Sequence, residues 1–184
     1  MSAVRNRACR VHIRVDDLEF SSCPLVGRVT FSPLHTPMTI YFYISREQYG
    51  AFSNFSRHGF ELNGKYWPTV EHYFQAQKFA GMELEDRIRQ AATPKDAKKL
   101  GWTRSTPLRA DWDEIKDEVM RQAIRRKFQT HAELRELLIS TEDEELVENS
   151  PKDYYWGCGA DGSGKNMTGI ILMEVRAEFL NEKA

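Results

Sequence analysis

Residues 67–79 read WPTVEHYFQAQKF, and this stretch decides how the middle of the chain folds. Pro68 and Thr69 are residue types that begin helices, and Gly81 is the type that ends them. The sequence therefore predicts a helix that starts at Pro68-Thr69 and stops at Gly81.

One face of this predicted helix combines opposite charges. At about 100° per residue, Glu71, Gln75 and Lys78 fall within about 60° of one another. Aromatic rings flank this polar stripe on both sides: Phe74 on one, His72 and Phe79 on the other. Glu71 lies in the first turn, where the helix dipole favours an ionised carboxylate.

Two interpretations of the polar stripe stay open. It is either a solvated face held by charge pairs, or the polar floor of a pocket in which Glu71 and Lys78 are catalytic. An ionised Glu71 suits a nucleophile, a group that stabilises a cation, or a base that activates water. It suits an acid less well.

Strands are predicted before the helix. Residues 40–44 form an apolar run typical of a strand. Residues 60–67 predict a hairpin, because Asn63-Gly64 is the preferred pair for a type I′ turn.

Helices are predicted after it, from caps and apolar spacing, at residues 84–92, 94–101, 111–128, 131–139 and 167–180. Asp111 is expected to cap its helix, with Glu114 completing a capping box. The predicted fold class is α+β: a compact, mainly α-helical single domain with a small β-sheet or hairpin.

A glycine-rich stretch near the C-terminus resembles nucleotide-binding motifs. Residues 159–166 read GADGSGKN, a G-x-x-x-x-G-K pattern, and residues 157–162 read G-x-G-x-x-G. A dinucleotide fold needs a further parallel strand after the loop, but only about 20 residues follow Gly164, and they predict one helix. Asn166 has no hydroxyl for magnesium, so neither nucleotide motif is predicted.

The loop still has properties that suit a ligand. It brings N–H groups to a helix start, where anions are favoured, and its glycines allow close approach of the backbone. Gly162 and Gly164 are therefore expected to cradle a phosphate or a ribose.

Composition excludes several classes of protein. The 184 residues carry a net charge of −1, which gives no overall attraction to nucleic acid or membranes. The sequence has no apolar run of about 18 residues and no signal peptide, so a cytoplasmic location is expected. Three cysteines and five histidines lack metal-ligand spacing, and no metal is expected. Residues 1–37 are expected to be an N-terminal extension, flexible or outside the core, before a domain at 38–184.

Several segments resemble the NADAR superfamily, in order and at the expected spacing. They are Phe52-Ser-Asn-Phe55, residues 67–79, Pro107-Leu-Arg109 with Asp111-Trp112, Val119-Met120, and YYWGCGADGSGKN before GIILMEVR. The resemblance runs from about Tyr41 to Arg176. It is greatest to a bacterial branch of N-glycosidases that cleave ribosylamine intermediates of riboflavin biosynthesis. It implies a mainly helical α+β domain without a metal or an organic cofactor.

The resemblance also implies site residues. It places Glu71 and Lys78 in the active site. It adds further pocket positions: Asn54, Gln75, Arg104, Trp156, Asp161 and Asn166. Two positions depart from the family pattern. Cys158 stands where relatives commonly have Asp, so if that Asp is a catalytic acid, its task either passes to Asp161 or is lost. Trp102 stands where they commonly have Arg, which leaves Arg104 alone to grip a phosphate.

The implied chemistry is the hydrolysis of a ribosyl C1–N bond. A carboxylate such as Glu71 stabilises the positive charge that develops on C1, and Asp161 or Lys78 supplies a proton to the leaving amine. Lys78 could instead form a Schiff base with the opened sugar. Trp156 is expected to stack on the base.

The expected partner is a small-molecule phosphoribosyl or ADP-ribosyl substrate. Nucleic acid is expected only as an ADP-ribosylated substrate, and no membrane is expected. Two alternatives remain: an ADP-ribosyl glycohydrolase acting on guanine or arginine, and a non-catalytic module that binds NAD-derived nucleotides.

Overall fold

Helix α1 (Val70–Gln77) is the central element of the computed structural model, which describes residues 38–183. Every residue from Val70 to Ala76 is buried. The helix begins where the sequence predicts, because the Thr69 side chain accepts a hydrogen bond from the backbone N–H of His72. It ends earlier than predicted, and Gly81 makes the left-handed turn that follows. The expectation for residues 1–37 lies outside the described residues.

The predicted hairpin is confirmed. Strands β2 (Phe60–Leu62) and β3 (Lys65–Trp67) pair antiparallel, and Phe60 lies opposite Trp67. Asn63 and Gly64 have φ angles of 54° and 72°, the left-handed values that a type I′ turn requires. Trp67 packs edge-on against Tyr73 of α1, with ring centroids 5.0 Å apart. The hairpin is thereby fixed to the central helix.

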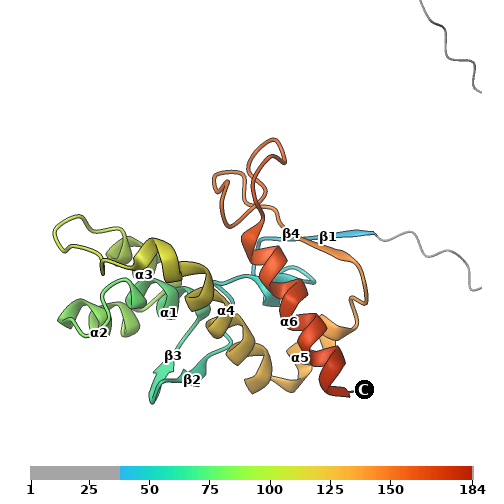
Figure 1. The fold of residues 1–184 in the computed structure, drawn as a ribbon, viewed down its shortest axis with the longest axis horizontal. Helices are drawn as coiled ribbons and strands as arrows, with labels where there is room; N and C mark the ends of the chain where they lie inside the picture. The colour runs from blue at the N-terminus through green and yellow to red at the C-terminus, as the bar shows by residue number, and fades with distance from the viewer. Residues whose placement is uncertain (1–37, 184) are drawn as a thin grey trace, which may run out of the picture. The chain divides into compact units, whose positions relative to one another are not determined.

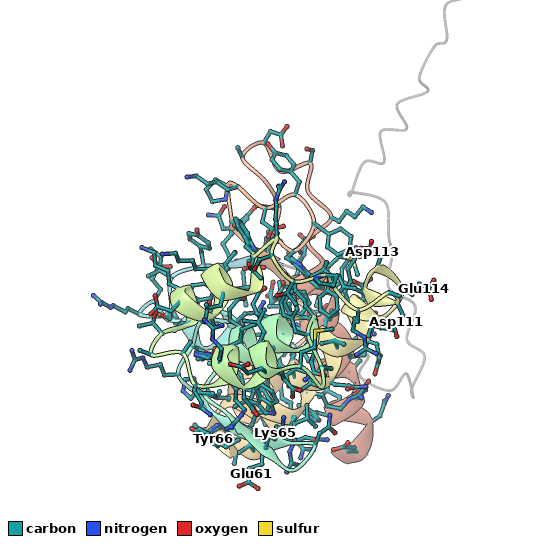
Figure 2. All side chains as sticks on the ribbon, turned by 90° about the vertical axis from the view of Figure 1, so that its left-hand side faces the viewer. Glu61, Lys65, Tyr66, Asp111, Asp113 and Glu114 are labelled. Carbon is teal, nitrogen blue, oxygen red and sulfur yellow. The ribbon has the colours of Figure 1, made fainter. Side chains whose placement is uncertain are left out.

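The remaining predicted helices are also present: α2 (Glu83–Arg89), α3 (Pro94–Gly101), α4 (Trp112–Thr130), α5 (Ala132–Ile139) and α6 (Met167–Lys183). The predicted capping box at the start of α4 is wrong. The carboxylate of Asp111 makes no cap and instead accepts two hydrogen bonds from the Arg109 guanidinium, at 2.6 and 2.9 Å. Figure 2 shows Asp111 close to Asp113 and Glu114 at this end of α4.

Helices α4 and α6 run in the same direction along one another (Figure 1). Two ion pairs join them, Arg121 to Glu174 and Arg125 to Glu178. In both pairs the partners are 53 residues apart in the sequence. These pairs are partly exposed, so each contributes little to stability, and the buried apolar side chains between the helices hold the contact.

A second pair of strands was only half predicted. The strand predicted at residues 40–44 is present as β1 (Thr39–Phe42), which begins one residue earlier and ends two residues earlier than predicted. It pairs in parallel with β4 (Glu145–Glu148), a strand that the sequence pattern did not reveal. The α+β fold class is confirmed. No helix among residues 38–183 has the length and apolar character that crossing a membrane requires.

Candidate active site

A cavity of about 410 Å³ opens over the polar face of α1. Its lining includes five of the residues named from the sequence: Asn54, Glu71, Gln75, Lys78 and Trp156. They come from three separate parts of the chain: the turn after the short 3₁₀ helix Gly50–Phe52, α1, and the loop between β4 and α6. The volume is within the range of small-molecule sites.

The stripe on α1 is a chain of hydrogen bonds between opposite charges. Lys78 Nζ donates to Gln75 Oε1 at 2.7 Å, and Gln75 Nε2 donates to Glu71 Oε1 at 2.9 Å. Glu71 and Gln75 are only 5% and 3% exposed. The interpretation as a solvated face is therefore wrong, and the stripe forms a pocket floor.

Burial acts on both charged ends of this chain. It raises the pKa of Glu71, while Lys98, the Gln75 amide and Lys78 act in the opposite direction. Burial also lowers the pKa of Lys78, and the attraction of Glu71 opposes that change. Each group is therefore easier to neutralise than in water, which is the condition for proton transfer or nucleophilic attack.

Aromatic rings form one wall of the pocket. The ring of Phe74 lies 5.1 Å from both Trp112 and Trp156. Lys78 Nζ lies 5.6 Å from the Phe74 ring centroid and 5.7 Å from that of Trp112. A planar ligand that enters here meets ring faces and edges beside the ammonium group.

Asn54 lies beside α1 with an unused acceptor. Its backbone carbonyl accepts from Glu71 N at 3.0 Å, and its side-chain Oδ1 is buried without a hydrogen-bond partner in the described part of the chain. Lys127 of α4 holds the same segment, donating to the carbonyls of Ala51 and Ser53 and to the Ser56 hydroxyl. An unpaired buried acceptor at a pocket wall is suited to a donor from a ligand.

The glycine-rich loop is closed by its own backbone. The N–H groups that lead into α6 donate to carbonyls of the same loop: Lys165 to Tyr154, Asn166 to Gly157, Met167 to Tyr155 and Thr168 to Trp156. They are not free to hold a phosphate, which contradicts the expected cradle. Neither Gly162 nor Gly164 lines the cavity. The loop lies at the N-terminal end of α6 (Figure 1).

Asp161 and Asn166 also lie away from the cavity lining. Asp161 is exposed, and its carboxylate accepts from the N–H and the hydroxyl of Ser163. The Asn166 side chain pairs with β4: its Oδ1 accepts from Glu148 N at 2.9 Å and its Nδ2 donates to Leu146 O at 2.8 Å. The expected acid is thus separated from Glu71 and Lys78.

Arg104 lies in an adjoining hollow of about 440 Å³ rather than in the main cavity. Lys78 and Trp102 line both spaces, so the two are neighbours. Trp102 is 67% exposed at this boundary, and Lys98 Nζ lies 5.3 Å from its ring centroid. Arg104 can therefore reach a group that extends out of the main cavity past Trp102.

Sequence reasoning missed five charged residues that line the cavity: Lys98, Asp113, Lys116, Glu148 and Asp153. Asp153 Oδ1 accepts from the backbone N–H groups of Tyr155 and Trp156, at 3.0 and 2.8 Å, and so orients the Trp156 segment. Glu148 is the last residue of β4, and this strand was not predicted because its four residues are too few to show a strand pattern. Among residues 38–183 no cluster of His, Cys, Asp and Glu has the arrangement of a metal site.

Comparisons with known proteins identify the family and the fold of this chain. The NADAR domain family matches this chain over residues 41–180. An N-glycosidase of Nostoc punctiforme is 52% identical over 147 residues, which cover 78% of this chain and 94% of that protein. The chloroplastic riboflavin biosynthesis protein PYRR of Zea mays is 42% identical over 164 residues, covering 81% of this chain and 26% of PYRR. The NMR structure of the Escherichia coli protein YbiA superposes with a TM-score of 0.76 at 46% identity, covering 82% of this chain and 89% of YbiA.

Proposed function

This chain belongs to the NADAR domain family, and from that premise we propose that it is an N-glycosidase acting on ribosylamine nucleotides. The proposed reaction is hydrolysis of the C1–N bond of a phosphoribosylamino-pyrimidine, which releases ribose 5-phosphate. The names of two relatives support the two parts of this proposal: one is an N-glycosidase and the other a riboflavin biosynthesis protein.

The observation that carries the proposal is the buried chain from Lys78 through Gln75 to Glu71. Cleavage of a ribosyl C1–N bond places positive charge on C1 and the ring oxygen. A fixed carboxylate that is buried from water stabilises that charge without having to reorganise. We assign this role to Glu71.

Lys78 has two roles consistent with its place. As an ammonium it polarises the leaving base or the sugar hydroxyls. As a free amine, which its lowered pKa favours, it attacks C1 of the opened sugar and forms a Schiff base. The aromatic wall with Trp156 provides a surface for the pyrimidine, and Arg104 in the adjoining hollow is suited to the 5-phosphate.

The adjoining hollow also favours a second candidate function. Main cavity and hollow together offer room for a larger substrate, so ADP-ribose attached to guanine or to arginine is the alternative. A module that only binds nucleotides has no use for Glu71 beside a phosphosugar, because the carboxylate would repel it.

The test measures two products with one preparation of the protein. Release of ribose 5-phosphate from a phosphoribosylamino-pyrimidine is compared with release of ADP-ribose from ADP-ribosylated DNA. The proposal requires the first reaction to be faster in kcat/KM. Faster release of ADP-ribose would establish the alternative, and binding without either product would establish a binding module.

A further inference from the structure

Glu148 combines a fixed backbone with a carboxyl oxygen, Oε2, that lacks a donor of normal geometry. Its N–H donates to Asn166 Oδ1, and its carbonyl accepts from Cys158 N at 2.9 Å and Ser150 N at 2.8 Å. Strand β1 pairs with it on the other side, where Phe42 is its register partner. The position of Cα is therefore determined from both edges of β4.

The carboxyl group, by contrast, has one oxygen without a hydrogen bond of normal geometry. Glu148 lines the main cavity and is partly exposed as a residue, but its Oε2 is buried and has no hydrogen-bond partner among the described residues. The hydroxyl of Thr168 is also buried without a hydrogen bond of normal geometry, and its interaction with the carboxyl group opposes the rise in the pKa of Glu148. A carboxylate with a purely structural role would have donors on both oxygens, because leaving one oxygen buried without a donor is costly.

The surroundings of the two glutamates in the cavity differ. Glu71 receives the Gln75 amide and is attracted by Lys98 and Lys78. Around Glu148 the charged groups are Asp153 and Glu71, which repel its negative charge, and Lys98, whose attraction is a smaller effect. Burial together with these carboxylates outweighs the opposing Thr168 hydroxyl and raises the pKa of Glu148 to about 7. Two carboxyl groups whose surroundings differ in this way are suited to different roles, one ionised and one protonated.

We propose that Glu148 is the general acid of the site, the group that gives its proton to the leaving nitrogen. The assignment rests on the proposed function. As the C1–N bond breaks, its electron pair goes to nitrogen, and the Glu148 proton makes the leaving group a neutral amine. Water then adds to C1, and its proton returns to the carboxylate, which restores the acid.

Two other acidic candidates, Asp161 and Asp153, are occupied. Asp161 is exposed and bonded to Ser163, and Asp153 Oδ1 is bonded to two backbone N–H groups. Asn166 becomes a positioning residue in this arrangement, because its side chain holds the backbone of Glu148.

The test uses two leaving groups on the full chain. Glu148→Gln is expected to slow hydrolysis of a phosphoribosylamino-pyrimidine by about 10²–10⁴-fold, the usual contribution of a general acid. Hydrolysis of p-nitrophenyl ribofuranoside 5-phosphate should be unchanged, since nitrophenolate leaves without a proton. Glu145→Gln, the same change at the exposed start of β4, is the matched control and should leave both rates unchanged.

The wild-type protein supplies a second measurement that does not depend on folding of the variant. A general acid must be protonated, so kcat/KM for the amine substrate should fall as pH rises through about 7, the pKa of Glu148. The nitrophenyl substrate should not show this fall.

Equal losses on both substrates in Glu148→Gln, or the same fall with pH for both in the wild type, would overturn the assignment and leave the proposed function standing. If the wild type cleaves neither substrate, the proposed function itself fails, and the assignment fails with it.

Discussion

Gln75 connects the two charges of the site and fixes which way each of them points. Its amide oxygen faces Lys78 and its amide nitrogen faces Glu71, and no other orientation gives both hydrogen bonds. Because all three residues lie on one helix, their separation is set by helix geometry and does not depend on loop closure.

The first prediction concerns Glu71. Glu71→Gln keeps the size of the side chain and removes its charge, so the developing cation at C1 loses its stabilising group. We expect kcat/KM to fall by about 10²–10³, by analogy with the loss of one preorganised stabilising group. The measurement is ribose 5-phosphate release at saturating and at low substrate. Glu83→Gln, on the exposed side of α2, is the control, and an unchanged rate for Glu71→Gln would remove Glu71 from the mechanism.

The second prediction concerns Lys78, whose pKa is lowered by burial. A free amine at this position forms a Schiff base with the opened sugar, and borohydride would reduce that bond to a stable adduct. We expect mass spectrometry to find the added ribose on the peptide that contains Lys78. Reduction should trap more product as pH rises toward the pKa of Lys78, because only the free amine attacks.

Lys95, exposed on α3, is the control for that experiment and should carry no adduct. If borohydride gives no adduct on Lys78 at any pH during turnover, the Schiff-base mechanism is wrong. Hydrolysis then proceeds directly through a cationic C1.

The sequence predicted the part of the site whose residues follow one another along a single helix. Spacing alone brought Glu71, Gln75 and Lys78 together, and their burial in the structure decided between the two interpretations. Glu148 was out of reach, because a single carboxylate at the end of a four-residue strand has no periodic signal.

The loop between β4 and α6 shows how glycines serve packing instead of ligand binding. A side chain at Gly164 would collide with the carbonyl of Gly157 and the backbone of Cys158. At Gly162 a Cβ would meet open space, although φ is +78°. The glycines that resemble a nucleotide-binding motif are therefore explained by the tight packing of the loop between β4 and α6.

The third prediction compares these two glycines. Gly162→Ala should cost about 1 kcal/mol of unfolding free energy, for a left-handed residue with a side chain. Gly164→Ala should cost about 1–3 kcal/mol, because the backbone has to move apart. Thermal unfolding monitored by circular dichroism measures both. A Gly162 variant that is the less stable of the two would contradict the packing role of Gly164.

Helices were easier to predict than strands for a physical reason. The caps at Thr69 and Thr93 are local contacts between residues three apart, and both are present. The cap at Asp111 failed because Arg109, only two residues away, competes for its carboxylate. Strand β4 depends on a partner far along the chain, and no local pattern encodes that pairing.

Lys127 ties the longest helix to the segment that contributes Asn54. Its ammonium is fully buried and surrounded by three neutral acceptors, with no carboxylate among its hydrogen-bond partners. Burial lowers its pKa from 10.5 to about 7. The unfolded chain therefore binds this proton more strongly than the folded chain between those two values.

The fourth prediction follows from that difference. As pH rises from 7 to 10.5, the free energy of unfolding of the wild type should rise relative to Lys127→Met, by at most about 1.4 kcal/mol per pH unit. A neutral Lys127 still donates two hydrogen bonds, and their loss should destabilise Lys127→Met by about 1–3 kcal/mol at high pH. Urea unfolding at pH 6 and pH 9 measures the effect.

Lys99→Met on the exposed side of α3 serves as the control, because a solvated lysine has no such dependence. A stability difference between the wild type and Lys127→Met that stays constant from pH 6 to pH 9 would show that Lys127 remains charged in the folded protein.

The parallel pairing of β1 with β4 sets an order of events when the chain is made. Thr39 and its register partner Glu145 are 106 residues apart. At 5–20 residues per second, β1 waits roughly 5–20 s on the ribosome before β4 has been synthesised. Until then its backbone is an open edge, so the nascent chain is most exposed to association with other chains during that interval.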